Sequence, residues 1–435
     1  MDPQRKEGRL EREVGLAGAV LLGLGSMVGT GVFVSIGIAA GVAGPSLLAA
    51  TLLAAAVAAA NGLSSAQLAA THPVSGGTYE YGYLELSPAW GFSAGWMFLL
   101  AKSASAATAA LGLSGYLFGL LGVDLDPLQV GMAVAGTLLI TAFVAGGIRR
   151  SNTGNAVVVG LTLLALVALV VAAVPRIASE GMQRFTPFVP GGETWTAGLE
   201  PVFHGAALMF VAFTGYGRIA TLGEEVREPR RVIPRAVILT MGIVTLLYLG
   251  VASAGVGVLG AEAFGRAAEE TAAPLEAVAA ALGLPALQVA LAIAAVTAMA
   301  GVLLNLVLGL SRVLLAMARR GDAPGFLRRV DEERGSPVAS VWACGLGIAA
   351  IALLGDVRLT WSFSAFTVLI YYGITNLAAL RLSGAERLFP RWIPVAGLIG
   401  CLGLAFWVEP VVWLTGLGLL ALGLAGHALG RRRTA

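Results

Sequence analysis

Apolar residues run along this chain in long continuous stretches, with charged residues mostly confined to the segments between them. A helix needs about 20 predominantly apolar residues to cross roughly 30 Å of hydrocarbon. The stretches that meet this need lie at 14–41, 46–70, 88–120, 127–147, 155–174, 198–222, 236–258, 286–317, 337–354, 360–380, 393–408 and 411–429. They are too long and too continuously apolar for barrel strands. We therefore predict an all-α polytopic membrane protein with about twelve transmembrane helices.

The composition supports a membrane class and excludes several others. Hydrophobic residues make up 57% of the chain and charged residues only 12%, against roughly 25% charged residues in soluble domains. Met1 to Glu13 forms a charged leader, and the apolar run after it is too long for a signal peptide, so the first span should be retained. Cys344 and Cys401 both lie inside apolar spans, so they predict neither a disulfide framework nor a metal site.

The charges between the spans predict the orientation. With the N-terminus inside, 21 of the 28 Lys and Arg residues fall on the inner side and four on the outer side, while Lys102, Arg218 and Arg312 lie within helices. Cytoplasmic loops carry an excess of Lys and Arg. We therefore expect both termini in the cytoplasm of a multi-pass protein of the plasma membrane. The bilayer is its expected surrounding, and no nucleic acid partner is expected.

Two spans contain glycines that predict a break in the helix. The first holds Gly23, Gly25, Gly29 and Gly31 near its middle, where we expect an unwound segment, and the sixth contains Phe213-Thr214-Gly215-Tyr216-Gly217. Glycine has poor helix propensity. Paired interruptions at corresponding positions of two halves indicate a transporter binding site. The alternative is that these glycines only let helices approach closely, as in small-xxx-small packing.

The interval between the two breaks also predicts the organisation of the chain. The second break lies five spans after the first, and an odd offset reverses the orientation in the membrane. We expect a leucine-transporter-type fold with a 5+5 inverted repeat. Its predicted segments are a leader at 1–13, a first repeat at 14–174, a second repeat at 198–380, two further helices at 393–429 and a cytoplasmic tail at 430–435.

Broken helices expose backbone groups that a zwitterion could satisfy. Unpaired amides and carbonyls at membrane depth are tolerated only where a ligand, water or protein meets them. A half-helix N-terminus carries partial positive charge and favours a carboxylate, while carbonyls at a half-helix C-terminus favour an ammonium group. An amino acid presents both groups, so this chemistry favours an amino acid as the substrate.

Four motifs, in order along the chain, resemble the amino acid permeases of the amino acid, polyamine and organocation (APC) transporter superfamily. They are Gly25-Ser26-Met27-Val28-Gly29-Thr30-Gly31-Val32-Phe33, the loop segment 73–79, the block from Phe213 to Pro234 that includes Glu224 and Glu225, and the segment 311–319. The resemblance covers nearly the whole chain. It implies ten core helices and alternating access.

The resemblance also implies a substrate site. The substrate carboxylate would meet backbone amides of Ser26, Met27, Val28, Gly29, Thr30 and Gly31. Its amine would meet carbonyls around Val211, Ala212 and Thr214, with Gly217 beside them. These assignments agree with the helix-dipole argument. Apart from the resemblance, Phe213 is a candidate gate over the substrate, and ordinary packing is its alternative role.

The chain departs from the family at positions that bear on coupling. Many relatives have an acidic residue where this sequence has Gly217, and several proton-coupled relatives have a fifth-helix lysine that aligns with Thr162. Lys102 instead lies near the middle of the third span. Ionisable residues at that depth usually face a cavity, and burial lowers the pKa of a lysine. We hypothesise that Lys102 titrates and carries the coupled proton.

Other roles for Lys102 and for its charged neighbours remain open. Lys102 could bind an acidic substrate side chain, or it could be a structural lysine paired with carbonyls. Arg218 is a candidate gate that could instead pair with a carboxylate such as Glu224. Glu80 and Glu85 lie in an inner loop, where we expect them to be solvated.

These residues predict a secondary active transporter rather than an enzyme. His72, His204 and His427 are scattered along the chain, so neither a catalytic set nor a metal site is predicted, and no cofactor is implied. The favoured activity is proton-coupled symport of a neutral amino acid. The alternatives are exchange of one amino acid for another, or transport of an acidic or amine substrate.

Overall fold

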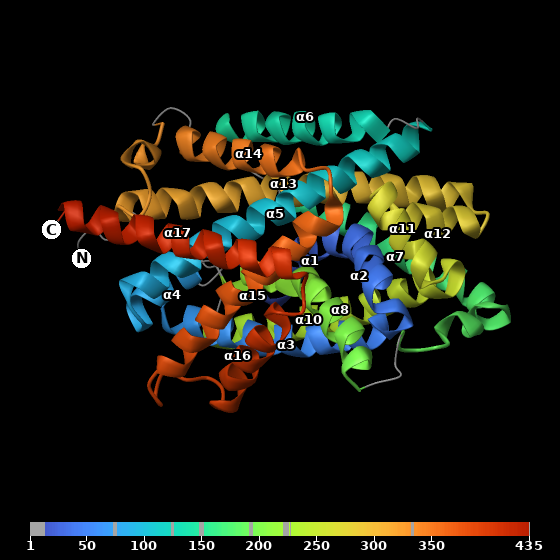
Figure 1. Ribbon diagram of the computed structural model, residues 1–435, viewed down its shortest axis with the longest axis horizontal. Coiled ribbons are helices and arrows are strands. Elements are labelled where there is room, and N and C mark those ends of the chain that lie inside the picture. Colours follow the sequence, from blue (N-terminus) through green and yellow to red (C-terminus); the bar gives the residue numbers. More distant parts are fainter. Residues whose placement is uncertain are drawn as a thin grey trace.

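A computed structural model of the chain describes residues 14–72, 76–122, 126–147, 152–190, 195–220, 226, 228–331 and 335–434. These residues form helices joined by short connections (Figure 1), and within them β-structure is limited to two isolated bridges. The leader, residues 73–75 of one family motif, Glu224, Glu225 and the final residue of the tail lie outside the described part.

The helices follow the predicted spans closely. Eight helical segments are long and apolar enough to cross a membrane, and three shorter apolar helices accompany them in the part of the chain searched. The bounds are α1 Leu16–Met27, α2 Ile36–Ala43, α3 Leu47–Thr71, α5 Pro88–Leu121, α6 Asp126–Ala145, α7 Asn152–Ser179, α8 Trp195–Phe213, α9 Gly217–Ala220, α10 Pro229–Leu259, α13 Pro285–Arg320, α14 Val338–Ala352, α15 Val357–Arg381, α16 Trp392–Ala405 and α17 Pro410–Thr434. The prediction of an all-α polytopic membrane protein is confirmed.

The helices form two packed groups. Helices α5, α6, α13 and α14 lie side by side along the long axis of the molecule (Figure 1) and contact one another. Helices α1, α3, α8 and α10 form the second group, in which α3 packs on α8 and α10, and α10 on α1. Helix α15 contacts both groups through α5 and α8. The two interrupted spans therefore lie together in the second group.

Both predicted interruptions are present, and both are short. Helix α1 continues through Gly23 and Gly25 and ends at Met27, and its cap Val28 is extended. A π-helical segment follows at Gly31–Ser35 and leads into α2. The sixth span narrows to a 3-10 turn at Thr214–Tyr216 between α8 and α9. The unwound segment expected in the first span is therefore present at Val28 and Gly29, while Gly23 and Gly25 before it remain helical.

Three short helices outside the spans were not predicted. Helix α4 covers Thr78–Glu85, and α11 at Ala261–Glu270 and α12 at Pro274–Ala281 fill the connection between α10 and α13. Helices α11 and α12 lie at the opposite end of the molecule from α4 and the C-terminal end of α17 (Figure 1). The two membrane faces thus carry different helical elements.

Candidate functional site

The two interruptions touch each other through their backbones. A Cβ added at Gly215 would lie 2.5 Å from the Ser26 carbonyl oxygen, and one added at Gly31 would lie 2.9 Å from the Ala212 Cα. Real side chains do not approach backbone this closely, so glycine is required at both points. The glycines therefore serve close packing, as in the alternative reading, and they also hold the two breaks together.

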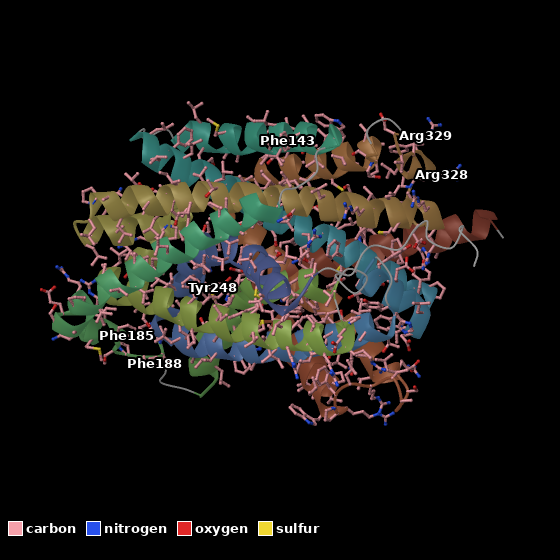
Figure 2. The ribbon with its side chains drawn as sticks, turned by 180° about the vertical axis from the view of Figure 1, so that it is seen from behind. Phe143, Phe185, Phe188, Tyr248, Arg328 and Arg329 are labelled. Carbon is pink, nitrogen blue, oxygen red and sulfur yellow. The ribbon has the colours of Figure 1, made fainter. Side chains whose placement is uncertain are left out.

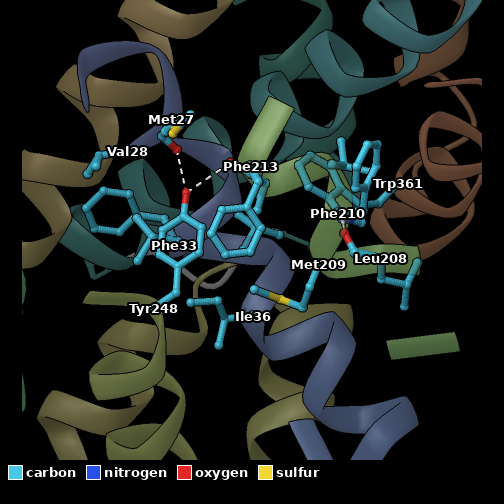
Figure 3. Packing of buried hydrophobic residues seen from close by; sticks show 14 of the residues in the cluster. Met27, Val28, Phe33, Ile36, Leu208, Met209, Phe210, Phe213, Tyr248 and Trp361 are labelled. Atoms are coloured by element: carbon cyan, nitrogen blue, oxygen red, sulfur yellow. Dashed lines mark hydrogen bonds between the residues drawn. The ribbon is translucent and has the colours of Figure 1, made fainter. Parts of the chain in front are cut away.

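Tyr248 of α10 joins the two breaks by hydrogen bonding. Its hydroxyl lies 2.7 Å from the Met27 carbonyl oxygen and 3.1 Å from the Ala212 carbonyl oxygen, and Figure 3 draws two dashed lines from that hydroxyl, one of them to Met27. A hydroxyl has one proton, so it donates to one carbonyl at a time. The Tyr248 side chain is fully buried, with its ring 5.1 Å from the Phe213 ring.

Lys102 reaches the second break from α5. Its ammonium nitrogen donates to the Thr214 hydroxyl at 2.8 Å, and that hydroxyl donates to the Val211 carbonyl at 2.7 Å. Lys102 is partly buried. Among the described residues, no carboxylate lies within 4 Å of its ammonium nitrogen. These two hydrogen bonds connect α5 to the interrupted sixth span.

Carbonyls predicted to hold a substrate amine already have protein donors. Val211 receives the Thr214 hydroxyl, Ala212 receives Tyr248, and the Thr214 carbonyl receives the Tyr372 hydroxyl at 3.3 Å. A carbonyl oxygen has two lone pairs, so a substrate amine at these positions would share the oxygens with these donors. In this conformation, the Val211 and Thr214 carbonyls each accept a hydrogen bond from within the protein, while the Ala212 carbonyl shares the single Tyr248 proton with Met27.

The structure brings together most of the predicted site residues. Met27, Val28, Thr30, Val211, Ala212, Phe213 and Thr214 are buried around the two breaks. The Thr30 hydroxyl is buried without a hydrogen-bond partner among the described residues. The Ser26 hydroxyl instead donates to the Leu22 carbonyl, and Gly29 packs against Val302. Thr30 is thus the side chain of this set with an unused polar group.

Accessibility around the breaks is asymmetric. Ser26, Gly215 and Gly217 are partly exposed and Arg218 is exposed, all on the side of α9. Phe33, which lies toward α2, is fully buried, as are Phe210 and Phe213. The site is therefore closed to solvent on the α2 side, and its exposed surface lies on the α9 side. Phe213 belongs to the closed side, and Arg218 to the more open one.

An ion-pair cluster lies on the closed side. Arg358 at the start of α15 pairs with Glu269 of α11 and with Glu409, each at 3.1 Å, and His204 of α8 lies 3.7 Å from Glu409. Burial disfavours the Glu409 carboxylate, but hydrogen bonding and the His204 and Arg358 charges outweigh it, so the pKa of Glu409 is lowered. These contacts connect α8, α11, α15 and the residue before α17.

The opposite face carries a second network, which corrects one expectation. Glu80 of α4 pairs with Arg320 at 2.7 Å, and Glu85 lies 2.5 Å from the His72 ring. Both carboxylates are mostly shielded, so the expectation that they are solvated was wrong. The Asp322 carboxylate accepts the Tyr79 and Tyr83 hydroxyls and lies 3.1 Å from His427. These contacts fix α4 and α17 to the end of α13.

Sequence reasoning missed the residues that close the site. Tyr248, Tyr372 and Trp361 are single aromatic residues within apolar spans, and Trp361 donates to the Leu208 carbonyl at 2.9 Å (Figure 3). Nothing in their spacing separates them from ordinary packing aromatics. In the part of the chain searched, His, Cys, Asp and Glu side chains form no group of three that could hold a metal ion.

Comparison with known proteins places these features in a family. The family model described as "Amino acid permease" matches residues 18–425. An uncharacterized transporter of Mycobacterium tuberculosis is 39% identical over 99% of this chain and 94% of its own length. A branched-chain amino acid permease of Bacillus subtilis is 28% identical over 94% of this chain and 90% of its length. A methylthioribose transporter of the same organism is 26% identical over 100% of this chain and 96% of its length.

Proposed function

The chain belongs to the amino acid permease family, and from that premise we propose that it is a proton-coupled symporter of neutral amino acids. Family membership makes it a membrane transporter. The substrate and the coupling ion are the parts that we propose. The substrate would bind between the two interrupted spans, and Lys102 would carry the proton.

The contact between Lys102 and Thr214 is the observation that carries the proposal. An ammonium group in a span is costly unless it is paired, and its acceptor here is a neutral hydroxyl. A lysine in such a place gains or loses its proton readily when its surroundings change. The same hydroxyl donates a hydrogen bond to the sixth-span backbone. A change in the protonation of Lys102 would therefore alter a hydrogen bond that leads directly to the proposed substrate site.

The chemistry around the breaks favours a neutral side chain on the substrate. Side chains at the two breaks include Met27, Phe213, Tyr248 and Thr214, and the charged residues named there, Lys102 and Arg218, are both cationic. A cationic substrate would place a second positive charge near Lys102 without a carboxylate partner in the part of the chain that the structure describes. The branched-chain specificity named for one relative is compatible with this apolar setting.

The proposed orientation puts the α9 and α4 face toward the cytoplasm. The Arg-rich segments lie on that face, and cytoplasmic loops carry the excess of Lys and Arg. Both termini would then be cytoplasmic in the plasma membrane, and the structure would represent an inward-facing conformation. The interruptions in the first and sixth spans support an inverted repeat of 14–174 and 198–380.

Uptake by purified protein in proteoliposomes tests the proposal. An acidic outside buffer should drive accumulation of radiolabelled neutral amino acids, with acidic, cationic and amine compounds and methylthioribose as the comparison panel. A gradient of one pH unit supports about tenfold accumulation by one-to-one symport. If uptake ignores the gradient but requires an amino acid inside the vesicles, the protein is an exchanger instead.

Replacing Arg358 with glutamine should increase the fraction of time that the closed, α2 side of the site is open. The substitution removes the contacts to both Glu269 and Glu409, and partly exposed ion pairs contribute up to about 1 kcal/mol each. Thr30→Cys would report the opening, because Thr30 is buried and both native cysteines are buried. A membrane-impermeant maleimide added outside should label the Thr30→Cys protein about threefold faster when Arg358→Gln is combined with it.

Arg266→Gln provides the matched control. Arg266 pairs with Glu262 one turn away within α11, so removing this ion pair breaks no contact between different helices. Labelling in this background should equal that of Thr30→Cys alone. Equal labelling in the Arg358 and Arg266 backgrounds would show that the cluster is not part of the barrier.

A further inference from the structure

A pocket that involves neither interrupted span lies where four helices begin or end. It is formed by the junction of α4 and α5, the end of α15 and the start of α16, and its volume is about 520 Å³. Its lining consists of Leu86, Trp90, Leu377, Leu380, Arg381, Arg391 and Val395. The pocket thus combines five large apolar side chains with two guanidinium groups and has no acidic side chain in its lining.

The two arginines are placed to meet an external anion. Arg381 ends α15 and Arg391 caps the start of α16, and both are exposed. Neither guanidinium group forms a hydrogen bond or ion pair with another described residue, whereas that of the nearby Arg387 donates to the Leu382 carbonyl. Glu386, the acidic residue between them in sequence, is engaged by Ser383. The charge of the pocket is therefore left uncompensated by the described part of the protein.

The position of the pocket matches the boundary between headgroups and acyl chains. It lies at the ends of spanning helices, and Trp90 and Trp392 beside it are 45% and 66% exposed. Tryptophan is enriched at this level of the membrane. Basic pockets between spanning helices on the cytoplasmic side bind anionic lipid headgroups. A small soluble anion would leave the apolar wall unused.

We propose that this pocket binds one anionic phospholipid, with its phosphodiester on Arg381 and Arg391 and an acyl chain against Trp90, Leu380 and Val395. The arginine fork suits phosphate oxygens. The lipid would bridge α5 to α15 and α16. The site is independent of the transport proposal, because it touches neither interrupted span.

Native mass spectrometry with phosphatidylglycerol and phosphatidylcholine tests the site. Wild-type protein should retain one phosphatidylglycerol under conditions that remove phosphatidylcholine. Arg381→Gln combined with Arg391→Gln should weaken that retention roughly 30-fold. Each arginine near an anionic lipid headgroup contributes about 1 kcal/mol, and about 1.4 kcal/mol corresponds to a tenfold change in affinity. Arg328→Gln combined with Arg329→Gln is the matched control and should change nothing, because these two arginines (Figure 2) are exposed and do not line the pocket.

A second variant keeps the charge and fills the space. Val395→Trp places a bulky side chain in the pocket at a position that is 40% exposed, so the fold should tolerate it. It should remove the bound lipid and the rise in melting temperature that phosphatidylglycerol gives the wild type. Retention equal to wild type in this variant or in the pocket double variant would overturn the proposal, as would equal retention of both lipids by the wild type.

Discussion

Lys102→Met is expected to abolish accumulation driven by a pH gradient while leaving substrate binding measurable. Methionine keeps the length and apolar stem of the side chain but cannot carry a proton. With a gradient of one pH unit, the wild type should reach about tenfold accumulation and the variant a ratio of about one. Uptake of radiolabelled substrate into proteoliposomes gives the ratio, and isothermal titration in detergent gives the binding.

Lys102→Arg separates a titrating group from a fixed charge. Arginine retains donors for the Thr214 hydroxyl, but it does not lose its proton in proteins. If Lys102 carries the proton, this variant should also fail to accumulate substrate. If arginine supports accumulation, the charge serves structure or substrate contact, and another group carries the proton. Full accumulation by the methionine variant would remove Lys102 from the coupling mechanism altogether.

Thr214→Val would show whether the proton on Lys102 acts through the sixth span. Valine removes the hydroxyl that links Lys102 to the Val211 carbonyl. Lys102 could then still titrate without a direct connection to the substrate site. Downhill uptake that persists while accumulation falls would assign the coupling to this link.

The spans were predictable because crossing a bilayer imposes a simple requirement on sequence. About 20 apolar residues are needed for each crossing, and every predicted span has a helix in the structure. Helices α4, α11 and α12 were not predictable in this way, because they have eight to ten residues and cross nothing. Their positions are set by tertiary contacts such as those of Glu80 and Glu269.

The candidate site was only partly readable from sequence. Glycine density located both breaks because glycine weakens a helix. It did not reveal that α1 would continue to Met27, since the surrounding helices hold the preceding residues in place. The role of Tyr248 could not be predicted from the sequence, for a different reason. A buried tyrosine hydroxyl needs a partner, but which carbonyl it meets depends on how α10 packs against α1 and α8.

Gly215→Ala is expected to disable transport without preventing insertion of the protein. The added Cβ would lie 2.5 Å from the Ser26 carbonyl oxygen and 2.6 Å from its carbon, so backbone must move. Such overpacking costs about 1–3 kcal/mol, which corresponds to roughly a 5- to 150-fold loss if the cost falls on the transport-competent state. Initial uptake rates in proteoliposomes, normalised to the monodisperse protein peak, measure this loss.

Gly242→Ala is the matched control, since an added Cβ there meets nothing within 4 Å and alanine favours the α10 helix. Its uptake rate should equal that of the wild type. A Gly215 variant that transports equally well would mean that the two breaks separate freely and that their contact belongs to packing alone. A selective loss in the Gly215 variant would mean that transport depends on the contact between Ser26 and the sixth span. The substrate would then be held by two breaks that act as one structural unit.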